Sequence, residues 1–78
     1  MFTATLRTSA DIGTAIQQAR LAAEMTQRDL AERLGVSQRY VWELESGKNV
    51  AAIARLLAVL HETGAQLKVE IPEGDLDG

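Results

Sequence analysis

The chain has 78 residues, of which 46% are hydrophobic and none is cysteine, and its formal net charge is −3. This length allows one small domain, and a domain of this size buries only about 60% of the surface of its unfolded chain. The missing cysteines exclude disulfides and most structural zinc sites. The single histidine, His61, disfavours a histidine metal centre as well. We therefore expect no metal and no cofactor, and we expect a second copy of the chain to reinforce so small a core.

The negative charge is concentrated at the C-terminal end. Residues 70–78 hold four of the eleven acids and no basic residue, so the first 69 residues carry seven acids against eight Lys and Arg. An acidic chain argues against nucleic acid as a partner, but the near-neutral body weakens that objection. Residues 72–78 contain almost no large apolar side chains and predict a disordered acidic tail.

Several classes of protein are disfavoured by the sequence. No apolar stretch approaches the roughly 20 residues of a membrane span, and the N-terminal end lacks the organisation of a signal peptide. We therefore expect a cytoplasmic protein with no membrane partner. Ser37 has no nearby His or Lys to activate it, and we expect no catalytic residue and no enzyme activity.

The spacing of apolar residues predicts a short extended segment followed by helices. Residues 1–8 alternate apolar and polar side chains, as a half-buried strand does. Helices are expected at about 9–24, 27–34, 38–46 and 50–61, with cap residues at Thr8 or Ser9, Thr26, Ser37 and Asn49. The last of these helices is apolar nearly all round and must bury more than one side. We expect its extra side to meet another subunit.

A final strand is predicted at residues 66–71, where strict alternation places Leu67, Val69 and Ile71 on one face. A lone strand needs a partner for its backbone groups. Two partners are open at this point: the N-terminal segment, or the same strand of a symmetry mate across a twofold axis.

The most informative stretch of the sequence is 27–45. Two helices that cross steeply over a tight turn need a small residue at the contact, a turn glycine and core residues at fixed offsets. Ala31, Gly35, Val41 and Leu44 occupy those places. The pattern predicts a helix-turn-helix, whose second helix enters the major groove of DNA. A generic two-helix hairpin is the alternative.

Four short motifs carry a family resemblance. They are Thr26-Gln27, Leu30-Ala31, Gly35-Val36-Ser37 and Leu44-Glu45-Ser46-Gly47-Lys48. With them, residues 11–62 resemble the Cro/repressor-like regulators, also called the XRE family. The ending of helix, glycine and strand is similar to the narrower group of HipB-like antitoxins, in which a C-terminal strand pairs with its mate. Those antitoxins bind a HipA-like serine/threonine kinase toxin and repress their own operon.

The resemblance implies a mainly α fold: a four-helix lambda-repressor-like helix-turn-helix domain with a C-terminal β-strand used in a dimer sheet. The predicted divisions are an extended segment at 1–8, the DNA-binding domain at 9–64, a dimerisation strand at 65–71 and the tail at 72–78. The implied function is that of a homodimeric repressor that binds double-stranded operator DNA with an inverted repeat. It would be the antitoxin of a HipBA-like pair in a bacterial cytoplasm, associated with the nucleoid. The alternative is a stand-alone XRE-family regulator without a toxin.

The resemblance also places the residues that would contact DNA. Gln38 and Arg39 fall where the family reads base edges, and their chemistry suits adenine and guanine respectively. Glu43 lies one turn later and either accepts from cytosine or is a solvated acid. Contacts to the DNA backbone are expected from Gln27, the counterpart of the family's phosphate anchor, and from Arg28, Ser37, Tyr40, Lys48 and Asn49.

The remaining assignments are structural. Arg20 and Glu45 match a pair that the family buries as a salt bridge between its first and third helices. Trp42 does not share the face of Val41 and Leu44, yet core packing is the favoured interpretation for it. The predicted dimer interface consists of Leu56, Val59, Leu60, Leu67, Val69 and Ile71.

Overall fold

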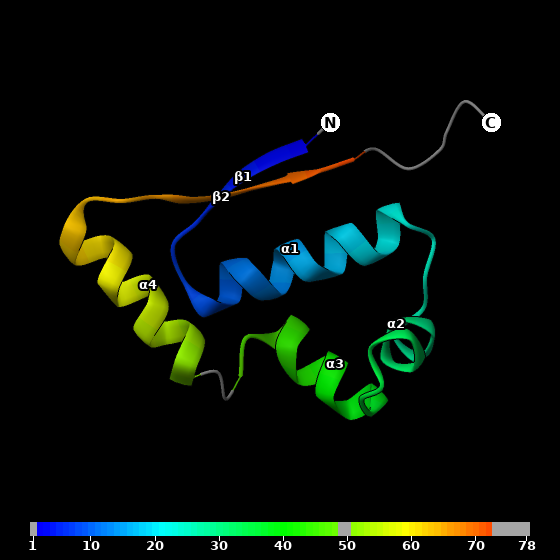
Figure 1. Ribbon diagram of the computed structural model, residues 1–78. Helices are drawn as coiled ribbons and strands as arrows, with labels where there is room; N and C mark the ends of the chain where they lie inside the picture. The colour runs from blue at the N-terminus through cyan, green and yellow to red at the C-terminus, as the bar shows by residue number, and fades with distance from the viewer. Residues whose placement is uncertain (1, 49–50, 73–78) are drawn as a thin grey trace.

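The computed structural model describes residues 2–48 and 51–72. The elements follow in the order β1 (Phe2–Leu6), α1 (Ser9–Ala22), α2 (Gln27–Leu34), α3 (Gln38–Ser46), α4 (Ala51–Thr63) and β2 (Leu67–Ile71). The two strands lie on one side of α1, and α2 and α3 lie on the other (Figure 1). None of the described helices is long and apolar enough to cross a bilayer. The predicted roles of Asn49 and of the tail from residue 73 onward lie outside the described residues.

Short-range hydrogen bonds set where the first helices begin. The Thr8 hydroxyl oxygen accepts from the Asp11 backbone N–H at 3.0 Å, and the Asp11 carboxylate accepts from the Thr8 N–H at 3.1 Å. Thr26 and Asp29 form the same reciprocal pair at the start of α2. Each reciprocal pair is a capping box, and it satisfies two backbone N–H donors that have no partner within the helix. Backbone N–H donors also lower the pKa of both carboxyl groups, because they favour the charged form.

Left-handed residues end these helices. Gly35 (φ 71°) closes α2 and Gly47 (φ 75°) closes α3, at the positions where the sequence predicts them. The first helix is shorter than predicted, since α1 ends at Ala22 and Glu24 adopts a left-handed φ of 57°. The turn between α2 and α3 therefore spans only residues 35–37, which keeps the two helices in contact.

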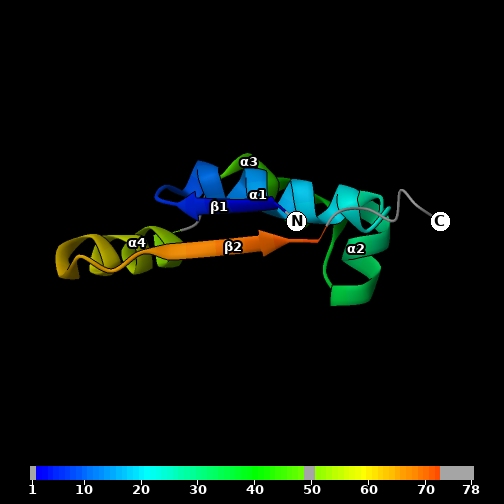
Figure 2. The same cartoon turned by 90° about the horizontal axis from the view of Figure 1, so that it is seen from above.

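The two strands pair with each other inside one chain. β1 and β2 run antiparallel in the register Phe2↔Ile71, Ala4↔Val69 and Leu6↔Leu67, and Figure 2 shows them side by side. Within the chain, the partner of β2 is thus the N-terminal segment, one of the two predicted partners. A strand shared between two chains stays a prediction, since a strand has two edges and β1 pairs with one of them. The apolar residues of both strands share one face, and Ile71 is fully covered there. The Ile71 side chain thus packs mainly within its own chain, and its role in a dimer interface stays a prediction.

The buried core is small and draws on every layer. Among the described residues, the buried apolar side chains are Ala15 of α1, Ala31 of α2, Val41 of α3, Leu57 of α4 and Ile71 of β2. Helix α4 stands apart from the body formed by α1, α2 and α3 (Figures 1 and 2). Leu56 and Val59 of this helix are 50% and 59% exposed. A single chain thus leaves much of the apolar surface of α4 uncovered.

Gly13 allows α1 and α3 to touch through their backbones. A Cβ atom at this position would overlap the carbonyl oxygen of Glu45 and lie 2.8 Å from the carbonyl oxygen of Leu44. Both obstacles are backbone atoms of α3, so neither can swing aside as the end of a flexible side chain does. A side chain at Gly13 would push the two helices apart.

Replacing Gly13 with Ala tests this close approach. Gly→Ala in an exposed helix stabilises by up to about 1 kcal/mol, but here the overlap should dominate and destabilise the fold by about 1–3 kcal/mol. We expect a lower midpoint of thermal unfolding by circular dichroism, while Thr14→Ala, at an exposed site on the same helix, leaves it nearly unchanged. A Gly13→Ala variant as stable as the wild type would contradict the contact.

Candidate nucleic-acid interface

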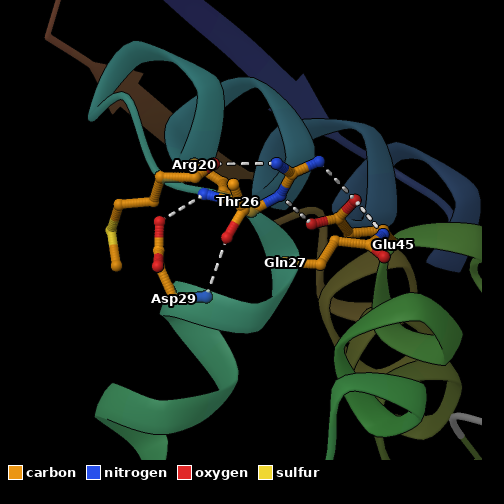
Figure 3. A network of polar contacts seen from close by, with 6 residues as sticks. Arg20, Thr26, Gln27, Asp29 and Glu45 are labelled. Atoms are coloured by element: carbon orange, nitrogen blue, oxygen red, sulfur yellow. Dashed lines mark hydrogen bonds and ion pairs between the residues drawn. The ribbon is translucent and has the colours of Figure 1, made fainter.

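A buried polar network joins the first three helices (Figure 3). The Arg20 guanidinium on α1 donates from Nε to Oε2 of Glu45 on α3 at 2.6 Å and from Nη2 to Oε1 at 3.1 Å. The same guanidinium donates from Nη1 to the Met25 carbonyl oxygen at 2.9 Å. The side chains of Arg20 and Glu45 are only 9% and 5% exposed. The family resemblance predicts this ion pair, and its two-pronged geometry fixes the angle between α1 and α3.

Gln27 completes the network from the start of α2. Its Nε2 donates to Glu45 Oε1 at 3.0 Å, so one carboxylate holds both α1 and α2 against α3. This contact was not predicted, because nothing in the sequence pairs residues 27 and 45. The amide of Gln27, the residue predicted to anchor a phosphate, is thus held in place by Glu45 in the protein alone.

The hydrogen bonds of the network favour the charged forms of both Glu45 and Arg20. Burial by itself opposes ionisation of Glu45, but the hydrogen bonds from Arg20 and Gln27 outweigh it and lower the pKa of this carboxyl below its ordinary 4.5. The hydrogen bond to Glu45 raises the pKa of Arg20. Both groups are therefore charged at neutral pH, and removing either one would leave the other buried without its counter-charge.

Four side chains line a shallow hollow beside this network: Gln27, Gln38, Arg39 and Trp42. Gln27 is the first residue of α2 and Gln38 is the first residue of α3. Two helix N-termini, with their unpaired backbone N–H groups, thus meet at one surface. Val41 of α3 is fully buried in the core, whereas Gln38, Arg39 and Trp42 of the same helix are exposed and line the hollow.

The structure brings together most of the residues predicted to read bases. Gln38 and Arg39 share the hollow, and the Arg39 side chain is 82% exposed. Glu43 lies one turn further along α3, where its Oε1 is 3.4 Å from Arg39 Nε. The predicted base reader Glu43 is thus an ion-pair partner of the predicted base reader Arg39.

The residues predicted to contact the DNA backbone are more scattered. The Ser37 hydroxyl oxygen caps α3 by accepting from the Tyr40 N–H at 3.0 Å. Tyr40 and Arg28 are exposed and are not part of the hollow. Lys48 follows α3 directly. Of the predicted backbone contacts in the described residues, Gln27 alone lines the hollow.

The interpretation of Trp42 as a core residue is wrong. Its side chain is 45% exposed and lines the hollow, and Lys48 Nζ lies 5.2 Å from the centre of its ring. The signal was present in the sequence, because Trp42 lies off the helical face of Val41 and Leu44. The contact with Lys48 depends on the turn at Gly47 and was not predicted.

Comparison with known proteins agrees with this arrangement. A family model described as helix-turn-helix matches residues 16–68, which is more than half of the chain. The chain belongs to the XRE-type helix-turn-helix family. This family consists of DNA-binding regulators, and the matched residues include α2, α3 and the short turn that joins them.

A named relative supports the same assignment. A protein of Sinorhizobium fredii (strain NBRC 101917 / NGR234), named uncharacterized HTH-type transcriptional regulator y4mF, is 34% identical over 67 residues. The match covers 86% of this chain and 88% of the relative. No solved structure matches the chain significantly.

The Glu45 network predicts a pH dependence of stability. Because the folded pKa of Glu45 is lowered, the unfolded state binds more protons near pH 4.5, and the contribution of the network is lost as the pH falls through the folded pKa. Glu45→Gln should cost about 3–5 kcal/mol at pH 7, since it leaves Arg20 without its counter-charge. We expect the stability difference between wild type and variant, measured by urea unfolding, to shrink below pH 4.5.

The matched control for this prediction is Glu32→Gln, which removes the same charge from an exposed position on α2. Asp11 and Asp29 shift stability in the same direction as Glu45, but they are present in all three proteins and cancel in the comparison. A constant difference between wild type and Glu45→Gln from pH 7 to pH 3 would contradict the role of Glu45.

Proposed function

We propose that this regulator is a homodimeric repressor that reads duplex DNA with the N-terminal half of α3. The observation that carries the proposal is the hollow, where two helix N-termini and the side chains of Gln27, Gln38 and Arg39 meet on one exposed surface. Amide and guanidinium groups of this kind suit both phosphate oxygens and base edges. The near-neutral body limits the nonspecific electrostatic attraction, so affinity depends on specific contacts and on dimerisation.

Arg39 and Glu43 form a pair suited to reading one base. The ion pair uses Nε of Arg39, which leaves the two terminal nitrogens to donate to O6 and N7 of guanine. Glu43 then orients the guanidinium along the surface of α3. Gln38, in the same hollow, has the donor and acceptor that adenine requires. Glu43 keeps its second predicted role, acceptance from cytosine, for a neighbouring base pair.

Gln27 is proposed to anchor a phosphate. A primary amide has two N–H donors, and Glu45 takes one of them in the folded protein. The other N–H can donate to a phosphate oxygen, together with the open backbone N–H groups at the start of α2. Ser37, Tyr40, Arg28 and Lys48 surround this point and are proposed as further contacts to the DNA backbone.

The dimer is proposed to form through α4. Ala52, Leu56 and Val59 are exposed and recur at positions i, i+4 and i+7, which places them in one stripe along the helix. Leu60 is half-buried beside Leu57, and Leu67 and Val69 are half-buried in the sheet, so these three contribute less free surface. A symmetric pair of chains would bury the stripe on itself and present two copies of α3 to an inverted repeat with half-sites about 10 bp or a multiple apart.

The toxin-neutralising role is a finer prediction that rests on the resemblance to HipB-like antitoxins. The exposed stripe on α4 supports a protein partner of some kind. The pairing of β2 with β1 uses one edge of β2 and leaves the other edge for the shared strand on which the narrower resemblance depends. A HipA-like kinase partner is tested by co-expression with the product of the neighbouring gene. If that product does not copurify with this chain, the HipA-like partner is excluded and the proposed function is that of a stand-alone regulator.

Substitutions in the hollow should separate base reading from backbone binding. On a duplex selected from a random pool by the wild type, Arg39→Ala should lose about 1–3 kcal/mol of discrimination at one base pair. Gln27→Ala should weaken binding to selected and random duplexes alike. Both effects are measured by fluorescence anisotropy at fixed salt, with Arg33→Ala on the far end of α2 as the control for loss of one cation. Equal losses on selected and random DNA for Arg39→Ala would overturn the assignment.

A charge on the α4 stripe should separate the subunits. Val59→Asp would place a carboxylate in the proposed interface, and we expect sedimentation equilibrium to give the mass of one chain. Ala58→Asp introduces the same residue about 100° round the helix from Val59, outside the stripe, where the side chain is also exposed, and should leave the dimer intact. A Val59→Asp protein that remains a dimer would show that the chains meet elsewhere.

A further inference from the structure

Trp42 is a large apolar side chain on a polar surface. It is the single tryptophan of the chain, it is nearly half exposed, and its neighbours in the hollow are Gln27, Gln38 and Arg39. An exposed indole forfeits the stabilisation that burial would give. The exposed apolar residues of α4 lie on a different element, so Trp42 is not part of that stripe.

Position along α3 makes Trp42 a neighbour of the two proposed base readers. Trp42 follows Gln38 by four residues and Arg39 by three, and residues at these spacings adjoin each other on a helix surface. The hollow confirms this, because all three side chains line it. A group bound in the hollow would thus lie near the indole as well as near Gln38 and Arg39.

Lys48 adds a charge at the edge of the same surface. Its ammonium lies 5.2 Å from the centre of the Trp42 ring, within the range of a cation–π contact. Lys48 does not line the hollow, so the hollow itself remains open. A cation that rests on the indole and borders this surface is suited to a phosphate, since DNA phosphates flank the bases that a major-groove helix reads.

We propose that Trp42 is a specificity residue that packs its indole against the methyl group of thymine. Thymine C5-methyl is the apolar feature that base pairs present in the major groove, and burial of one methyl group against an apolar side chain favours binding. A protein partner fits this surface less well, because it would have to desolvate Arg39 and the two glutamines around the indole. The inference rests on the proposed function and adds a preference for A·T pairs beside the bases read by Gln38 and Arg39.

The test uses the full chain and the duplex selected from a random pool. Each thymine is replaced in turn by deoxyuridine, which removes only the methyl group. We expect the wild type to lose about fourfold in affinity at one or two thymines in each half-site, the value for one buried methyl group. The Trp42→Ala protein should show no loss at those thymines. Leu21→Ala, which shortens an exposed apolar side chain on α1, should retain the wild-type pattern.

Intrinsic fluorescence gives a second readout that does not need a variant. Because the chain holds one tryptophan, a change in emission on saturation with the selected duplex reports Trp42 alone. An unchanged emission, a selected half-site without thymine, or equal deoxyuridine losses in wild type and Trp42→Ala would each overturn the proposal while leaving the proposed function intact. Failure of the wild type to enrich any sequence would overturn both.

Discussion

The Glu45 carboxylate is the constraint on which the arrangement of the helices depends. It accepts from Arg20 on α1 and from Gln27 on α2, and it belongs to α3, the helix proposed to read DNA. A buried carboxylate without partners would be strongly unfavourable, so the fold is stable only when these helices are correctly placed. The same contacts orient the Gln27 amide at the edge of the hollow. The stability of the fold and the proposed contacts to DNA thus depend on the same carboxylate.

The small core explains why further contacts matter so much. In the described parts of the chain, α1, α2, α3, α4 and β2 each contribute one buried apolar side chain, which is little for a domain that lacks disulfides. The backbone contact at Gly13 and the hydrogen bonds that cap α1 and α2 add to this core. The uncovered stripe on α4 offers further apolar surface whose burial would stabilise the domain. Dimerisation there would add both stability and the second recognition helix that an inverted repeat requires.

The sequence-based predictions were more accurate for interactions between residues close in sequence than for interactions between distant residues. Thr26 with Asp29, Ser37, Gly35 and Gly47 were placed correctly because caps and turns depend on residues three or four positions apart. The strand at Leu67–Ile71 was predicted from its alternation, but alternation does not select a partner, and two partners were left open. Trp42 was assigned to the core although its helical position pointed outward. Arg20 and Glu45 came from the family resemblance, since the residues alone do not connect them.

The sequence by itself determined the local elements, the helix-turn-helix and the residues available on its exposed face, because hydrophobic periodicity, caps and glycines act over a few positions. The tertiary structure decided which distant groups meet: β1 with β2, Gln27 with Glu45, and Lys48 with Trp42. Each of these contacts depends on the angles between whole elements. Those angles are set by backbone approach and buried charge, which one-dimensional spacing does not encode.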